Sequence, residues 1–333
     1  MRDALKREAR RDPRHTARDM RYAICDKPSA MSTAHWLALT TTPGIGGVTV
    51  RKLLDRFGDL ESIFGATVEE LIEIPRVTPA VAGQLLAAPL EALEAELLLL
   101  DDEGINLLTW DDDRFPPHLR VLPDAPMVLF LRGSMGREDA QAVAIVGTRT
   151  PSESAAQLAT ALSRELASRG LTIVSGLALG VDTAAHQGAL EAAGGRTLAV
   201  LGSGIRFIHP KENVELAEQI AGCGALLSEL HPNTAPRGQT LMARDRIVSG
   251  LSRAVIVVEA GEKSGSLDTA AKAVKQGRLV YAAPGSPGAE QLLAGGARRL
   301  DPDALDYDAV AGEIARHLLP DESPSPPRQT SLW

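Results

Sequence analysis

The feature that most constrains the fold is a regular alternation of short apolar runs and helical segments over residues 142–295. The runs are continuous in Val, Ile, Leu and Ala, which is typical of strands buried on both faces of a parallel sheet. We therefore predict six strand–helix units in an extended Rossmann-like, doubly wound α/β fold with a mostly parallel sheet. The predicted strands are 142–147, 171–176, 196–204, 225–229, 254–261 and 279–286, and the predicted helices lie near 152–169, 182–193, 211–221, 241–251, 266–276 and 288–295.

Upstream of this alternation the apolar pattern is helical. Apolar residues recur three and four positions apart over residues 35–98, which indicates amphipathic helices. Thr67 and Thr78 stand where two of these segments begin, at positions where helix N-caps are expected. The sequence therefore predicts a small all-helical domain over 35–98, ahead of an α/β domain over 99–302.

A glycine turn interrupts the predicted helical domain. Gly44-Ile45-Gly46 follows Pro43 between two helical segments. One interpretation is a tight turn between helices. The other is a helix-hairpin-helix turn of the SAM-like kind, whose glycines let backbone N–H groups approach a DNA phosphate. DNA contact by these three residues is a hypothesis that the sequence leaves open.

Two regions flank these predicted domains. Residues 104–110 and 127–133 each contain an apolar run, and we expect them to add strands at the edge of the sheet. Residues 1–34 are basic and lack apolar periodicity. They form a disordered leader or a DNA-binding arm, unless the start is misassigned and Met31 is the first residue.

Composition and charge narrow the function. The net charge of −8 argues against a protein that coats duplex DNA, because that activity needs a basic surface. With 3% aromatic residues, a wide stacking platform for bases is excluded as well. Cys25 and Cys223 lie far apart, which is typical of a reducing cytosol and argues against a disulfide framework or a zinc site. No run of about 18 apolar residues occurs, so we expect a cytoplasmic protein without a membrane span.

Small residues follow nearly every predicted strand of the α/β domain. In open α/β sheets, ligands bind at the carboxyl ends of the strands, where helix N-termini also point. Several such turns on one edge would expose N–H groups and hydroxyls over a broad surface that suits anions. These turns are Gly147-Thr148, Ser175-Gly176, Gly202-Ser203-Gly204, Glu259-Ala260-Gly261 and Pro284-Gly285-Ser286.

Arginines lie close to these turns. Between Arg237 and Arg253 the chain has four Arg and one Asp, a local surplus of positive charge in an acidic protein. Because Arg pairs bidentately with phosphate, we predict that Arg149, Arg244 and Arg246 contact it. Arg253 is better interpreted as a solvated helix charge.

Other polar groups near the turns have structural interpretations. Ser264 and Ser266 precede a predicted helix, and capping that helix competes with binding an anion. Asp182 is better explained as an N-cap than as a catalytic acid, and His186 as a satisfied histidine than as a general base. The sequence lacks a Walker A motif, a GxGxxG fingerprint after the first strand and a GxSxG elbow. We therefore predict a binding site with no catalytic residue, metal or cofactor.

Long motifs of the chain resemble the DprA/Smf family of DNA-processing proteins. The resemblance extends from about Trp36 to Leu300 and is carried by SGLALGVDTAAHQGAL (175–190), GGRTLAVLGSGIRFIHPKEN (194–213), RIVSGLSRAVIVVEA (246–260) and SGSLDTA (264–270). It implies an extended Rossmann fold after a helical module, single-stranded DNA binding in a basic pocket, and a homodimer. It also implies loading of a RecA-type recombinase during natural transformation, without catalysis.

Matching the family's pocket assigns DNA contacts to individual residues of this chain. The residues so placed are Gly147, Thr148, Arg149, Ser175, Gly176, Gly202, Ser203 and Gly204, with Arg244 and Arg246 beside them. Ser264, Gly265 and Ser266, at the start of a predicted helix, complete the expected phosphate site.

The chain departs from the family pattern at one point of this site. The family carries a His-Phe-Pro-(Arg)-Arg-Asn-Arg run, whereas residues 239–246 read QTLMARDR, with Ala243 and Asp245 replacing an Arg and the Asn. We expect weaker DNA binding or an altered ligand. The alternative function is a Rossmann-like nucleotide-binding enzyme or sensor. The related nucleotide phosphoribohydrolases carry a catalytic Glu in a Pro-Gly-Gly-x-Gly-Thr-x-x-Glu run, and residues 264–270 lack that Glu.

The C-terminal end contains a possible docking peptide. A predicted helix over 303–319 is followed by a Pro/Ser-rich tail, 320–333, which we expect to be disordered. The tail ends in Gln329, Leu332 and Trp333, a spacing that resembles the peptide with which bacterial proteins dock on the sliding clamp. Clamp binding by this tail is a hypothesis.

Overall fold

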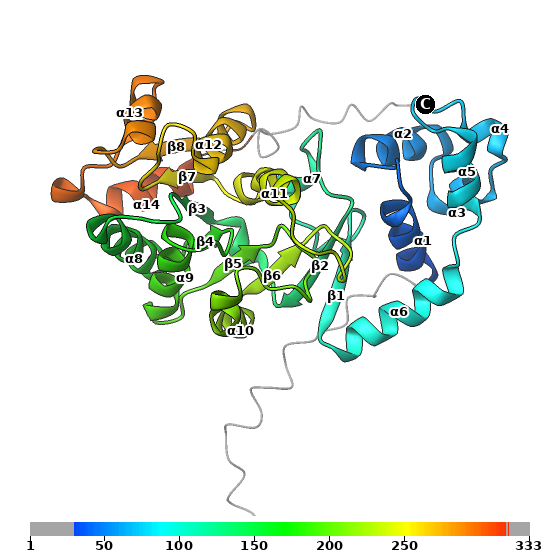
Figure 1. Ribbon diagram of the computed structural model, residues 1–333, viewed down its shortest axis with the longest axis horizontal. Helices are drawn as coiled ribbons and strands as arrows, with labels where there is room; N and C mark the ends of the chain where they lie inside the picture. Colours follow the sequence, from blue (N-terminus) through cyan, green and yellow to red (C-terminus); the bar gives the residue numbers. More distant parts are fainter. Residues whose placement is uncertain (1–29, 318, 320–333) are drawn as a thin grey trace, which may run out of the picture.

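The computed structural model describes residues 30–317 and 319, and its N-terminal part is helical (Figure 1). Thr67 and Thr78 are confirmed as N-caps. The Thr67 hydroxyl accepts from the Glu70 N–H, and the Glu70 carboxylate accepts in return from the Thr67 N–H, which completes a capping box. The helices are α1 (Ala30–Thr41), α2 (Gly47–Phe57), α3 (Leu60–Gly65), α4 (Val68–Leu71), α5 (Pro79–Leu86) and α6 (Leu90–Asp102).

Helix α1 begins at Ala30, inside the range 1–34 that was predicted as a leader. Residues 30–34 form the first turn of α1, because Ala34 is fully buried against the module. The turn between α1 and α2 contains Gly44 with φ of 91°, a left-handed conformation that favours glycine. In this turn Ile45 is buried, whereas Gly44 and Gly46 are exposed. Residues 1–29, including Cys25, lie outside the described residues.

Nine strands form one sheet in the order β1-β2-β6-β5-β4-β3-β7-β8-β9. The run from β6 to β9 is parallel, and the hairpin β1–β2 pairs antiparallel with its β6 edge, as the sequence predicted. The short β9 was not predicted, since its two arginines have no apolar pattern. The strands are β1 (Ile105–Thr109), β2 (Val128–Gly133), β3 (Ala142–Val146), β4 (Thr172–Ser175), β5 (Thr197–Val200), β6 (Ala225–Ser228), β7 (Ala254–Val257), β8 (Leu279–Ala282) and β9 (Arg298–Arg299).

Helices cover both faces of this sheet, which confirms the doubly wound fold (Figure 1). The helices that follow β1 in the chain are α7 (Pro117–Arg120), α8 (Glu153–Ser168), α9 (Val181–Glu191), α10 (Val214–Cys223), α11 (Gly238–Gly250), α12 (Gly265–Lys275), α13 (Pro287–Ala294) and α14 (Tyr307–Arg316). Side chains alternate along β3: Val143 and Ile145 join the apolar cluster under α8, α9 and α14, whereas Ala144 and Val146 join the cluster under α11 and α12. Both faces of the strand are thus buried.

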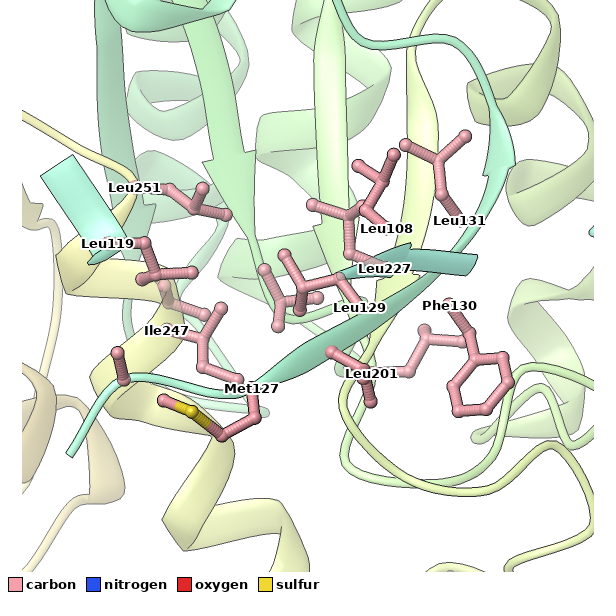
Figure 2. Close-up of a cluster of buried hydrophobic side chains, with 14 of the residues drawn as sticks. Leu108, Leu119, Met127, Leu129, Phe130, Leu131, Leu201, Leu227, Ile247 and Leu251 are labelled. Atoms are coloured by element: carbon pink, nitrogen blue, oxygen red, sulfur yellow. The ribbon is translucent and has the colours of Figure 1, made fainter. Parts of the chain in front are cut away.

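One apolar cluster joins the β1–β2 hairpin to the helices beside it. Figure 2 shows Leu129 of β2 among buried side chains that include Leu119 of α7 and Ile247 of α11. The same cluster continues into Trp36 of the helical module, so the module and the sheet share a core. No helix within residues 30–317 is long and apolar enough to span a membrane.

The helical module is also fixed to the sheet by a polar contact. The Nη2 atom of Arg51 on α2 donates to the carbonyl oxygens of Arg120 and Leu122, at 2.7 and 2.6 Å. Gly47, at the start of α2, lies so close to this segment that a Cβ there would be 2.7 Å from the Ala125 carbonyl oxygen. The glycine turn before α2 is therefore held at a fixed place beside the α/β part.

Candidate nucleic-acid interface

A cavity of about 670 Å³ opens where the strand order reverses, between β3 and β7. The chain leaves β3 toward α8 on one face and leaves β7 toward α12 on the other, so the two loops separate and open a crevice. This is the position at which open α/β sheets bind ligands. Eight of the residues predicted from the sequence line the cavity: Gly147, Thr148, Arg149, Gly176, Arg244, Ser264, Gly265 and Ser266.

Two predicted glycines, Gly202 and Gly204, serve close packing at the end of β5. A Cβ on Gly202 would lie 2.6 Å from the Cα of Leu241, and one on Gly204 would lie 2.2 Å from the carbonyl oxygen of His231. Real Cβ atoms do not approach other atoms so closely. These glycines let α11 and the loop after β6 contact the strand end, and they are not among the residues that line the cavity.

Two predicted serines, Ser175 and Ser203, bind backbone instead of facing the cavity. The Ser175 hydroxyl donates to the carbonyl oxygen of Ile145 at 2.7 Å, and the Ser203 hydroxyl donates to that of Phe207 at 2.6 Å. Both side chains are buried. A hydroxyl that donates to a backbone carbonyl has no remaining proton to donate to a phosphate.

Arg246 is bound to a carboxylate away from the cavity. Its two terminal nitrogens donate to the two oxygens of Glu229 at 2.6 and 2.5 Å, and its Nε donates to the Asp124 carbonyl oxygen at 2.9 Å. Its side chain is 16% exposed. The structure therefore does not place Arg246 beside the other predicted phosphate contacts, and its bidentate fork is already used.

Arg244 forms part of the cavity floor. Its Nη1 donates to the Val200 carbonyl oxygen at 2.7 Å and its Nε to the Leu241 carbonyl oxygen at 3.3 Å. Within the described residues Nη2 forms no hydrogen bond and so keeps its donors. A Cβ on Gly176 would lie 1.7 Å from Nη1, so the glycine is required by this arginine. Arg244 is thus a buried, fixed cation at the cavity.

Arg149 and Lys263 are the exposed cations of the cavity wall. Neither side chain forms an ion pair or hydrogen bond within residues 30–317. Beside Lys263, Ser264 caps α12 by accepting from the Ser266 N–H, so the capping role predicted as one alternative is present. The N-terminus of α12 adds its free N–H groups and partial positive charge to these cations.

Asp182 is not the N-cap that the sequence suggested. The helix α9 begins at Val181, and the Asp182 carboxylate accepts from the N–H groups of Gly176 and Ala178 in the preceding loop, at 3.1 and 3.3 Å. This loop contains Leu177 in a left-handed conformation with φ of 61°, which is costly for leucine. Asp182 therefore fixes the shape of the loop.

Asn213 holds the same loop from the other side. Its amide donates to the Leu177 carbonyl oxygen at 2.9 Å and to the Thr183 hydroxyl at 2.8 Å. No sequence pattern predicted this residue, because Asn213 lies 36 positions from Leu177 and has no local signature. Lys263 was also given no role, although it directly precedes Ser264-Gly265-Ser266, the helix start predicted as a phosphate site.

The carboxylates of the cavity are electrostatically coupled to Arg244. Burial raises the pKa of Asp182, and the nearby Arg244 guanidinium opposes that rise. Burial also raises the pKa of Asp245 to about 6, and Arg244 and Lys272 oppose the shift while Asp182 and Asp268 add to it. The site thus combines cations with two buried acids, Asp182 and Asp245, whose pKa values are both raised.

Two further predictions can be compared with the structure. Arg253 is not a solvated helix charge. It is buried, and its guanidinium donates to the carbonyl oxygens of Ala140 and His317. His186 is buried, with Nδ1 2.7 Å from the Thr197 hydroxyl, and burial lowers its pKa to about 3. The histidine is interior and neutral as expected, but its buried Nε2 has no hydrogen-bond partner within residues 30–317, so it is not fully satisfied.

The sequence of the chain matches known families over both parts of the structure. Residues 106–306 match the family model described as DNA recombination-mediator protein A, which is more than half of the chain. The chain belongs to this family. Residues 37–88 match a SAM-like helix-hairpin-helix tandem, in agreement with the glycine turn between α1 and α2.

Relatives in this family include Protein Smf from Synechocystis sp., 37% identical over 78% of this chain and 66% of its own length. DNA processing protein DprA from Bacillus subtilis is 43% identical over 56% of this chain and 62% of its own length. The chain thus spans less than two thirds of these relatives.

Two solved structures extend the family match to the fold. The DprA of Streptococcus pneumoniae superposes with a TM-score of 0.73 and 30% identity, over 86% of this chain and 99% of that one. The DprA of Helicobacter pylori, studied for its unique single-stranded DNA binding mode, has a TM-score of 0.57 and 32% identity over 63% of this chain and 95% of that one.

Proposed function

We propose that this chain binds single-stranded DNA in the cavity between β3 and β7 and loads a RecA-type recombinase on it during natural transformation. The observation that carries the proposal is a pair of exposed cations in the cavity wall, Arg149 and Lys263, which have no ion-pair partner within residues 30–317. Two cations and a set of free N–H groups at a ligand-binding crevice suit successive phosphates. Arg244 adds a fixed donor below them.

The shape of the site favours a single strand over a duplex. A crevice of about 670 Å³ admits a flexible chain. A duplex, stiff over about 150 base pairs, does not bend into such an opening without a large cost. The acidic net charge of −8 also disfavours binding to the outside of a duplex. The single-stranded DNA binding described for the Helicobacter pylori relative supports the same choice.

The partners follow from the family. We propose a RecA-type recombinase as a partner because the family is described as DNA recombination-mediator protein A. The homodimer is likewise proposed from the family. The Gly44–Gly46 turn is proposed as a second phosphate contact, since Gly46 is exposed at the start of α2. The clamp peptide with Gln329, Leu332 and Trp333 lies outside the described residues and stays a prediction.

The test is fluorescence anisotropy with a labelled single-stranded oligonucleotide and the matching duplex, using the full chain. We expect the single strand to bind more tightly, and the bound complex to accelerate recombinase filament formation on that strand. Equal binding of both forms, or none, would contradict the proposal.

The same protein should be incubated with AMP. Release of ribose phosphate would favour the enzymatic alternative, for which the carboxylates Asp182, Asp245 and Asp268 in the cavity are the available acids. We propose that the chain is not an enzyme and that AMP stays intact.

A further inference from the structure

The cavity is chemically divided. Its loop side carries the exposed cations Arg149 and Lys263 with the N-terminus of α12, whereas its α11 side combines Leu241 and Met242 with the Arg244–Asp245 ion pair. The exposed cations suit phosphate, whereas the Asp245 carboxylate repels it. A ligand that fills both sides therefore has an anionic part, an apolar part and a hydrogen-bond donor, which is the chemistry of a nucleotide.

Asp245 keeps an acceptor free for such a donor. Its Oδ1 lies 3.2 Å from the Nε of Arg244. Among the described residues its carboxylate accepts no hydrogen bond, so Oδ2 has no donor within residues 30–317. The side chain is 14% exposed and lines the cavity. An acceptor in such a place is costly unless a ligand or water supplies the missing hydrogen.

A second carboxylate of the cavity shows the contrast. Asp268 on α12 also lines the cavity, but its Oδ2 is bound to Lys272 one turn later on the same helix. That ion pair satisfies the oxygen within the protein. Asp182 and Asp268 thus each accept at least one hydrogen bond, whereas Asp245 accepts none within residues 30–317.

We propose that Asp245 selects the base of the bound strand, favouring bases with an exocyclic amine over thymine; the inference rests on single-stranded DNA being the ligand. In a single strand the Watson–Crick edges are open to side chains. Cytosine and adenine each present an amine that donates to a carboxylate, the pairing that Asp and Glu make with the cytosine amine in duplex DNA. Thymine presents one N–H between two carbonyl oxygens, and these repel a carboxylate.

The position of Asp245 also explains why it affects the choice of base more than the binding of the phosphates. Asp245 lies on α11, whereas the exposed cations lie on the loops after β3 and β7. Removing the Asp245 charge changes which base the α11 side binds, and it removes no phosphate contact. Leu241 and Met242 on the same helix supply an apolar surface for the base.

The experiment compares oligo-dC, oligo-dA and oligo-dT of equal length at pH 8, by competition against one labelled strand. We expect the native chain to bind oligo-dC and oligo-dA about fivefold to tenfold more tightly than oligo-dT, as one good base contact allows. In Asp245→Asn the amide offers both a donor and an acceptor, so the ratio should fall close to one while oligo-dT binding improves. Asp268→Asn is the matched control and should keep the native ratio.

The outcomes separate this inference from the proposed function. Binding of all three strands with the same ratios in the native chain and Asp245→Asn would overturn the base selection and leave the DNA site standing. Failure of the native chain to bind any of the three would overturn the proposed function and this inference together. Thermal unfolding of each variant confirms that the change in ratio belongs to a folded protein.

Discussion

The turns after β3 and β5 look alike in sequence and differ in use. Each follows a buried strand with glycine and a small hydroxyl residue, Gly147-Thr148 after β3 and Gly202-Ser203 after β5. The first lines an open cavity at the point where the strand order reverses, whereas the second lies under α11. A glycine at a strand end thus permits close approach, and the topology decides whether a ligand or a helix approaches.

The arginines of the two regions follow the same division. Arg149, at the reversal point, is exposed and has no partner within residues 30–317. Arg246, beyond the covered turn, is held by Glu229. One is available to a phosphate and the other stabilises the fold. The predictions below test this division, beginning with the largest effect.

Removing Arg246 should mainly affect stability. Arg246→Ala leaves the Glu229 carboxylate, which is 22% exposed, without its cation. Breaking such a pair costs about 3–5 kcal/mol when it is well buried, and we expect a loss near the lower value. Chemical denaturation measures it. An unchanged free energy of unfolding together with weakened DNA binding would place Arg246 in the site after all.

Gly176→Ala should disturb the cavity floor. The new methyl group overlaps the Arg244 guanidinium, which is fixed by the Val200 carbonyl, so the arginine must move. We expect a loss of about 1–3 kcal/mol, as for other overpacked sites, and weaker binding of single-stranded DNA. Gly238→Ala is the matched control, because Gly238 also lines the cavity but has open space around it. Equal effects of the two changes would refute the role given to Gly176.

Much of this fold was predictable because its signals are local. The six strand–helix units, the edge hairpin and the caps at Thr67 and Thr78 all follow from apolar spacing and residue type. Five of the thirteen predicted phosphate contacts lie away from the cavity in the structure. Whether Gly202 meets DNA or Leu241, and whether Arg246 meets phosphate or Glu229, depends on residues distant in sequence.

The loop after β4 shows the same limit more sharply. Leu177 is strained, and its conformation depends on Asp182 nearby and on Asn213 from another strand–helix unit. Sequence patterns report periodicity and capping, and they do not report which side chains support a strained loop. Such residues become visible only when the units are assembled.

Lowering the pH should strengthen the binding of oligo-dT, whose base the Asp245 carboxylate repels. The folded-state pKa of Asp245 is about 6, above the ordinary 3.8, and the groups that face it are Arg244, Lys272, Asp182 and Asp268. As the pH falls through 6, the cavity loses a negative charge, and we expect affinity to rise about threefold. The folded state holds the extra proton between about pH 4 and 6, so this group's contribution to stability also rises as the pH falls through that window. In Asp245→Asn the rise in affinity near pH 6 should be smaller; an identical rise would assign it to another group.

The smallest effect is expected at the glycine turn of the helical module. Gly46→Ala has open space around its Cβ, so stability should hardly change. If the turn contacts a phosphate, the methyl group obstructs it and affinity falls about twofold to threefold, the size of a weakened single contact. Gly83→Ala, which also has open space in α5, is the control. Identical binding by both variants would confine the DNA to the cavity.

The most direct test of the account compares the salt dependence of single-stranded DNA binding in Arg149→Ala/Lys263→Ala with that in Arg246→Ala. Each lost phosphate contact should flatten the log–log slope by about 0.7. The account predicts a slope flatter by about 1.4 for the double variant and an unchanged slope for Arg246→Ala. A native slope in the double variant, or a flattened slope in Arg246→Ala, would contradict the division between the open and the covered ends of the sheet.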